Sequence, residues 1–174
     1  MKNIDKKIDR LVEHVTKLNP EMGGMPMCPF ARIGLDKDEV EFIKEGKNTL
    51  VFALKYIKDM PKGKTLVVCA TDAKDFTQKQ LEDFCEEWQD FAIERDLYLY
   101  PWHPDDTDGQ IAGLPHGNPD LAMILVQTFS DLNQKAAWLH NKTNYYSYWK
   151  KDYYDKIVGE RLKHDKDLTK PNRI

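Results

Sequence analysis

The first residues of the chain place apolar side chains at helical spacing. Between residues 4 and 18, isoleucine, leucine and valine recur with charged residues between them, which predicts an amphipathic helix. Pro20 ends this pattern, because the residue before a proline is pushed out of the helical conformation. Residues 20–30 then combine prolines and glycines with methionines and Cys28. We expect an irregular loop there that packs against the protein or lines a site.

Further along the chain, short apolar runs alternate with helical patterns. The runs that predict strands occupy residues 39–43, 65–70, 96–102 and 121–128. A helix beginning near Pro119 is the competing prediction for the last run, because proline is tolerated in a first helical turn. Helical patterns occupy residues 49–60 and 77–92, and the second begins with a Thr77–Gln80 capping box. Ser130 is placed to cap another helix.

This alternation predicts an α/β fold of two or three layers, with a small mixed sheet flanked by helices. A length of 174 residues, near the ~150 typical of one domain, predicts a single domain over residues 1–162. Residues 163–174 are polar and would form a C-terminal tail. Before it, Tyr146, Trp149 and Tyr153 share one face of an expected helix. Such an aromatic stripe is typical of a core or of the interface of a homo-oligomer.

Composition narrows the class of partner. A net charge of -3, from 26 basic and 29 acidic residues, argues against a protein that binds the nucleic-acid backbone. No stretch approaches the ~20 apolar residues of a membrane span, and the first residues lack the apolar run of a signal peptide. Cys28, Cys69 and Cys85 are too few and too widely spaced for a disulfide framework. We expect a cytoplasmic protein whose partner is a small-molecule ligand, with no nucleic acid and no membrane.

A long loop holds most of the candidate chemistry. Residues 101–119 have no periodicity, and loops of that length tend to be functional. They carry His103 and His116, and Asp120 follows the loop. Because loops at strand ends converge on one edge of an α/β sheet, we expect this loop to meet the Cys28 loop over a cleft.

The leading hypothesis is a metal-dependent small-molecule enzyme. His103 and His116, with Cys28 or Asp120, would hold a divalent transition metal such as zinc or iron, since imidazole and thiolate are favoured ligands. The methionines beside Cys28 would favour Cu(I) instead. The ordinary alternative is that His103 is a packed loop histidine and His116 a turn residue.

The catalytic roles follow from these ligands. The metal would act as a Lewis acid or activate water, with Asp105 or Asp106 as general base. A second hypothesis makes Cys28 a nucleophile with His103 as its base, against the alternative of an inert buried thiol. A third is a non-catalytic binding or assembly protein that works through its aromatic C-terminal helix.

Short motifs at residues 28–31, 103–104 and 112–113 resemble those of a family of uncharacterised bacterial proteins of about this length. The Cys-Pro-Phe-Ala sequence at residues 28–31 is similar to the CPFA segment that follows the family's first helix. The His-Pro pair at residues 103–104 resembles the family's HP marker, and the Ala-Gly pair at residues 112–113 resembles its AG marker. Pro119 resembles a proline that precedes the family's last strand. The resemblance covers roughly residues 5–135. It implies no known activity, cofactor or substrate, but it puts Cys28 and His103 in two marker motifs, as a shared site requires.

Overall fold

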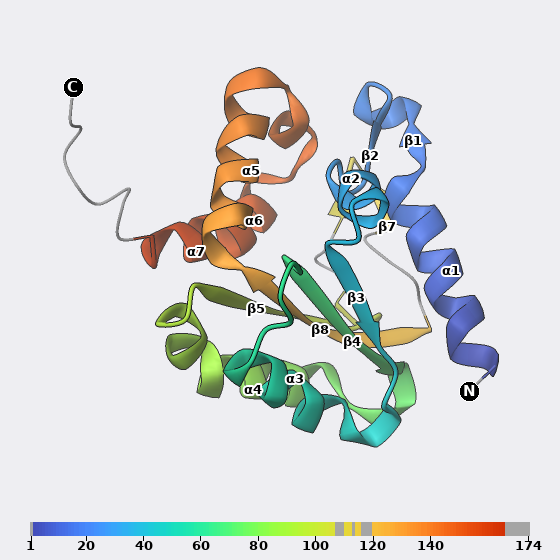
Figure 1. Ribbon diagram of the computed structural model, residues 1–174. Helices are drawn as coiled ribbons and strands as arrows, with labels where there is room; N and C mark the ends of the chain where they lie inside the picture. Colours follow the sequence, from blue (N-terminus) through green and yellow to red (C-terminus); the bar gives the residue numbers. More distant parts are fainter. Residues whose placement is uncertain (1, 107–109, 113, 116–119, 166–174) are drawn as a thin grey trace.

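A computed structural model describes residues 2–106, 110–112, 114–115 and 120–165. Its centre is a four-stranded sheet in the order β3-β4-β8-β5 (Figure 1). The strands are β3 (Val40–Ile43), β4 (Leu66–Asp72), β5 (Leu97–Trp102) and β8 (Leu121–Thr128). Strands β3 and β4 are parallel, whereas β8 runs antiparallel to both β4 and β5. The predicted mixed α/β fold with a small sheet is therefore confirmed, and residues 121–128 form a strand rather than a helix.

Two helices cover one face of this sheet. Helix α3 (Thr49–Lys58) connects β3 to β4, and α4 (Gln78–Ile93) connects β4 to β5. Both connections step across the sheet in the same direction, so right-handed crossovers place both helices on the same side. Figure 1 shows them together below the sheet. The predicted capping box at the start of α4 is confirmed, with both Thr77–Gln80 hydrogen bonds formed.

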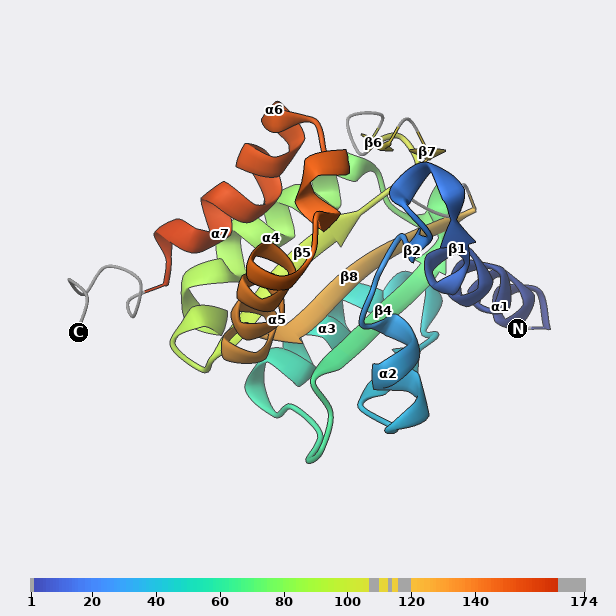
Figure 2. The same cartoon turned by 90° about the horizontal axis from the view of Figure 1, so that it is seen from above.

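The other face is covered by elements from both ends of the chain. They are α1 (Lys2–Thr16), α2 (Ala31–Asp36), α5 (Phe129–Lys142), α6 (Lys151–Tyr154) and α7 (Glu160–Lys163). Seen from above, α1 and α2 lie to one side and α5–α7 to the other, with β4 and β8 between them (Figure 2). Helix α2 approaches β3 closely at Gly34, where a Cβ atom would lie 3.2 Å from Cγ2 of Val40.

The two loops with special residues contain short paired strands. In the Cys28 loop, β1 (Leu18–Asn19) pairs with β2 (Met25–Pro26), and in the long loop β6 (Gln110–Ile111) pairs with β7 (Leu114–Pro115). The short helical turns are η1 (Pro20–Met22), η2 (Gly46–Asn48), η3 (Ala73–Asp75), η4 (Tyr145–Tyr148) and η5 (Asp155–Gly159). The Cys28 loop is thus partly regular, because its two glycines with positive φ, 62° at Gly23 and 81° at Gly24, turn the chain back on itself.

Two local predictions were wrong. Ser130 does not cap α5, which begins at Phe129 after Thr128; instead the Ser130 hydroxyl donates to a carboxylate oxygen of Asp96 at 2.5 Å. The aromatic C-terminal segment is not one helix: the turn η4 is separated by residues 149–150 from a continuous helical stretch over residues 151–163, which α6, η5 and α7 make up. An isolated bridge between Trp149 and Ile111 occupies that break, because tertiary pairing outweighs helical propensity there. Of the expected polar tail, residues 166–174 lie outside the described residues.

Candidate functional site

The two faces of the sheet differ in how completely they are covered. The closed face is the one that packs on α3 and α4, and its central residues Val67, Cys69 and Ile124 are each 0% exposed. The open face is the opposite one. Leu66 and Leu125 on the two interior strands are only half-buried on this face, as is Phe42 on the neighbouring edge strand β3. Coverage on that side is therefore incomplete.

A pocket occupies the uncovered part of the open face. This open-face pocket has a volume of about 320 Å³, within the ~300–1,000 Å³ common for small-molecule sites. The sheet forms its floor, and its walls come from α1, the segment at residues 27–31, α2, α5 and the C-terminal turns. Toward the end of the sheet where β5 finishes, Ile8 and Leu11 of α1 pack on Trp102 and close the face.

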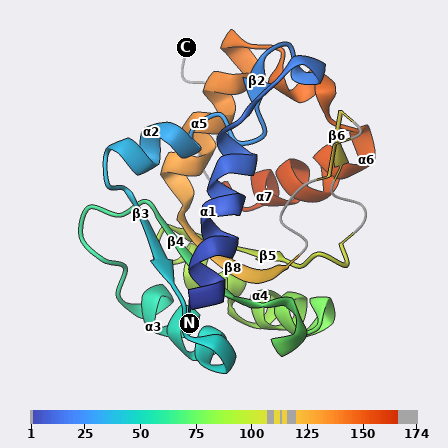
Figure 3. The same ribbon diagram turned by 90° about the vertical axis from the view of Figure 1, so that its right-hand side faces the viewer.

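Aromatic side chains build one wall. Tyr145 and Tyr153 are buried in a cluster with Met22 and Met27 of the Cys28 loop. The hydroxyl of Tyr145 donates to the Met27 carbonyl oxygen at 2.5 Å, and Trp149 stacks on Tyr153 with ring centroids 5.0 Å apart. Figure 3 shows the β1–β2 loop beside the segment that links α5 and α6. The aromatic stripe foreseen from the sequence thus lines this chain's own cluster and pocket.

Cys28 lies on the pocket wall. Its backbone N–H donates to the carbonyl of Val15 in α1 at 2.9 Å, which fixes the loop against that helix. The residue is exposed, but protein surrounds the concave pocket, so desolvation raises the pKa of the thiol. The backbone N–H groups of Phe30 and Ala31 oppose that rise without reversing it. The thiol is therefore protonated near neutral pH, whereas a nucleophilic cysteine needs a lowered pKa.

Charged groups on the wall are few. Lys135 pairs with Asp131, its neighbour one turn away in α5, at 2.6 Å. Arg161 is 5% exposed, and its Nε donates to Oδ1 of Asn133 at 2.9 Å. Neither side chain was singled out from the sequence, because a lone arginine in a polar C-terminal stretch looks like a solvated residue. Only the fold brings Arg161 against the sheet.

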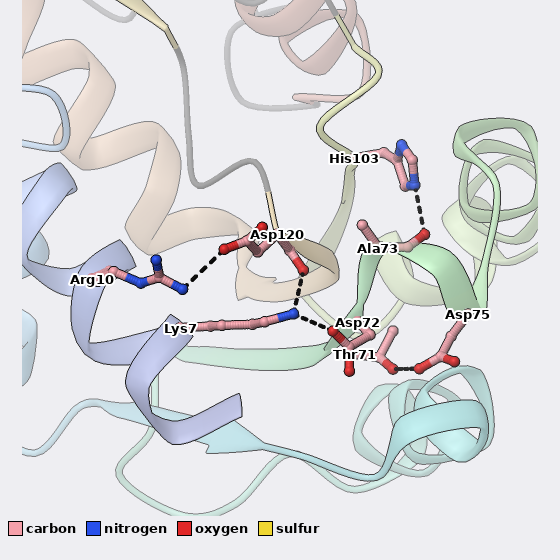
Figure 4. Close-up of polar contacts among 8 residues, drawn as sticks. All are labelled: Lys7, Arg10, Thr71, Asp72, Ala73, Asp75, His103 and Asp120. Atoms are coloured by element: carbon pink, nitrogen blue, oxygen red, sulfur yellow. Dashed lines mark hydrogen bonds and ion pairs between the residues drawn. The ribbon is translucent and has the colours of Figure 1, made fainter. Parts of the chain in front are cut away.

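Two of the other predicted site residues, His103 and Asp120, lie at the end of the sheet, and neither lines the pocket (Figure 4). Lys7 of α1 forms an ion pair with Asp72 at the end of β4 and donates to the backbone oxygen of Asp120. Arg10 donates to the Asp120 carboxylate at 2.9 Å. The Lys7 hydrogen bond holds the pKa of Asp72 below its usual range, against the opposing effect of desolvation. These contacts fasten α1 to the strand ends.

His103 belongs to this cluster and is 5% exposed. Its Nε2 lies 3.0 Å from the carbonyl oxygen of Ala73, and its Nδ1 accepts the Asp105 backbone N–H at 3.1 Å. Since a carbonyl only accepts, Nε2 carries the proton, and both ring nitrogens are occupied. Among its neighbours, the Asp105 carboxylate is exposed and lies 3.4 Å from Nδ1. The Asp106 carboxylate faces Lys156 at 3.8 Å.

The metal hypothesis gains no support from the described part of the chain. Within it, no group of three or more His, Cys, Asp or Glu side chains is arranged to hold a metal ion. His103 would have to give up a hydrogen bond to become a ligand, and Asp120 is paired with Arg10. His116, the remaining predicted ligand, lies outside the described residues.

No hydrogen bond or ion pair among the described residues joins Cys28 to His103. Cys28 is held at Val15, near the end of α1, whereas the cluster around His103 is tied to α1 at Lys7. Val15 follows Lys7 by eight positions in the helix, which is about 12 Å along the axis. The Cys28 loop and the cluster around His103 are therefore fastened near opposite ends of α1.

The other two cysteines are core residues, as their positions on an apolar strand and helix face predict. Cys69 and Cys85 both belong to the cluster on the closed face. Burial raises the pKa of Cys69 to about 12 and raises that of Cys85 further above its ordinary value.

Comparison with known proteins adds no relative. No protein-family model matches the sequence, no curated protein matches it, and no solved structure matches the fold. The resemblance to the bacterial family with the CPFA and HP motifs remains a prediction, and its markers at Gly113 and Pro119 lie outside the described residues. No helix in the described ranges is both long and apolar enough to cross a membrane.

Proposed function

We propose that this protein binds a small apolar molecule in the open-face pocket. The observation that carries the proposal is a cavity of about 320 Å³ over a sheet face whose strands are apolar on both sides. Exposed apolar surface in the middle of a sheet is costly, because each buried apolar Å² contributes about 25 cal/mol. A bound apolar molecule would recover that free energy, and small-molecule sites are typically concave and mostly apolar with few polar groups.

The lining favours binding over catalysis. Cys28 has no histidine among its described contacts, and its surroundings keep the thiol protonated. Lys135 and Asp131 neutralise each other, and the phenol groups of Tyr100 and Tyr153 lie 3.4 Å apart with their pKa values raised by desolvation. No activated nucleophile or acid–base pair is therefore present on the described walls. The proposal is closest to the third sequence hypothesis, with the aromatic segment acting as a pocket wall.

An uncharged fluorescent molecule tests this proposal. N-phenyl-1-naphthylamine is apolar and fluoresces strongly only when it leaves water. We expect saturable binding of one molecule per chain. Val12 lines the pocket from α1, so Val12→Trp would fill part of the cavity and weaken binding at least tenfold, which corresponds to about 1.4 kcal/mol.

Val51→Trp is the matched control. Val51 is a helical valine too, but it lies exposed on α3, on the other side of the sheet. Its replacement should leave the affinity unchanged, with excitation at a wavelength that tryptophan does not absorb. Absence of saturable binding, or equal affinities of the two variants, would contradict the proposal.

A further inference from the structure

The open-face pocket carries an uncompensated positive charge. Its lining includes one carboxylate, Asp131, and two basic side chains, Lys135 and Arg161. Asp131 is paired with Lys135 at 2.6 Å. Arg161 forms no ion pair among the described residues, and it is linked to the Asp165 carboxylate through Asn133, which accepts from Arg161 and donates to Asp165.

Arg161 is also incompletely hydrogen-bonded. The residue is 5% exposed, and Asn133 accepts from Nε, but Nη2 is buried without a hydrogen-bond partner. A buried guanidinium is stable only when it is paired and its N–H groups find acceptors. The tyrosines around it supply ring and hydroxyl contacts rather than charge, since burial keeps the pKa values of Tyr98 and Tyr146 above their ordinary value.

A second donor on the same pocket is in the same state. The indole Nε1 of Trp149 is buried and forms no hydrogen bond of good geometry, although the Tyr145 hydroxyl lies near enough to interact with it, and Trp149 lines the pocket as Arg161 does. An indole N–H can only donate, as can a guanidinium. Unpaired buried donors are rare in folded proteins and each calls for an explanation. On this cavity, the buried Nη2 of Arg161 and Nε1 of Trp149 both lack an acceptor at good geometry, and only Arg161 also carries a charge.

We infer that the ligand of the open-face pocket is an apolar acid, a molecule with a hydrocarbon or aromatic body and one carboxylate that pairs with Arg161. The inference rests on the proposed function and specifies its ligand class. The apolar floor takes the body, Arg161 compensates the carboxylate, and Trp149 offers a further donor to an acceptor of the ligand. A single negative charge matches the single unpaired positive charge on the wall.

Calorimetry with naphthalene-2-carboxylate and naphthalene-2-carboxamide at neutral pH tests this inference, because the two molecules differ in charge and hardly in shape. We expect the carboxylate to bind the unmodified protein at least tenfold more tightly than the amide, as charge-assisted hydrogen bonds in a dry site do. In Arg161→Gln the ratio should fall to about one, through loss of carboxylate affinity alone. Arg161→Lys keeps the charge and should retain part of the preference.

Lys79→Gln is the control. It removes one positive charge from an exposed ion pair with Asp83 on α4, outside the pocket, so the preference for the carboxylate should survive. Equal binding of carboxylate and amide to the unmodified protein would overturn the inference while leaving the pocket intact. A preference that persists in Arg161→Gln would overturn it as well. If neither naphthalene compound nor N-phenyl-1-naphthylamine binds, the proposed function itself fails. The comparison on the unmodified protein decides the matter even if Arg161→Gln does not fold.

Discussion

The closed and open faces of the sheet are made from equally apolar strands, yet only one of them is fully covered. Along β8, Ile124 on the closed face is 0% exposed, and its neighbour Leu125 on the open face is half-buried. Helices α3 and α4 are crossover helices that together cover the closed face. On the open face, α1 and α2 lie to one side and α5–α7 to the other, and the strands between them are left partly uncovered (Figure 2). The pocket therefore exists because of the topology of the covering elements rather than because of polar residues on the strands.

Thiol reactivity gives the largest contrast between the faces. Cys28 lines the open-face pocket, whereas Cys69 and Cys85 lie in the core of the closed face. In the native protein, a thiol-specific reagent should modify Cys28 at least about a hundredfold faster than the other two, which need unfolding to react. The Cys28 rate should rise with pH beyond the ordinary range of a free thiol, since its pKa is raised.

Counting modified thiols by mass spectrometry, with and without denaturant, measures this contrast. One modified cysteine per native chain and three per unfolded chain are expected. Fast modification of Cys69 in the native protein would contradict the complete burial of the closed face.

The next effect is on stability. Ile124→Ala removes a fully buried side chain from the closed face and should lower the free energy of unfolding by about 2–5 kcal/mol. Leu125→Ala, one residue along the same strand, loses a half-buried side chain that borders the pocket and should cost less than about 1.5 kcal/mol. Urea unfolding of both variants measures the difference. Equal losses would show that the faces are equally packed.

A smaller effect is expected at the rim of the pocket. Tyr145→Phe deletes the buried hydrogen bond to the Met27 carbonyl and should lower the free energy of unfolding by about 1 kcal/mol, since the carbonyl is left unpaired. Tyr148→Phe serves as the control, because its hydroxyl accepts from Asn144 at an exposed position, and should change stability by less than about 0.5 kcal/mol. If Tyr145→Phe left the free energy of unfolding unchanged, this hydrogen bond would not be what holds the Cys28 loop in place.

The smallest effect lies at the end of the sheet. The folded-state pKa of Asp72 is depressed by Lys7, so this pair contributes stability above the unfolded pKa of the carboxyl, and the contribution is lost as pH falls through the folded pKa. Lys7→Met should therefore be less stable than the unmodified protein at neutral pH, with the gap closing in acid. Thermal unfolding against pH measures it, and Lys79→Met, which removes an exposed i,i+4 pair with Asp83, should show almost no gap. A gap independent of pH would contradict the pairing.

Much of the fold could be predicted from the sequence. The strand at residues 121–128 has the predicted bounds, and the first strand is shorter by one residue. These segments combine apolar runs with clear boundaries, so local pattern and tertiary structure agree. The aromatic segment escaped prediction because a bridge between Trp149 and Ile111, far apart in the sequence, interrupts its helix.

The candidate site could be predicted only in part. Cys28 does line the pocket, because a loop with apolar residues had to pack down somewhere. His103 lies instead in a hydrogen-bonded cluster at the end of the sheet. Arg161 has no motif around it, and its importance depends on burial and on a missing acid partner, neither of which a linear pattern encodes.

The most direct measurement locates a bound apolar molecule on the sheet. In a protein labelled at its methyl groups, nuclear Overhauser effects from bound N-phenyl-1-naphthylamine should reach Leu66 and Leu125 on the open face, and none should reach Val67 or Val126 on the closed face. Contacts confined to the closed face, or a bound molecule that touches neither set, would contradict the pocket as the working surface of this protein.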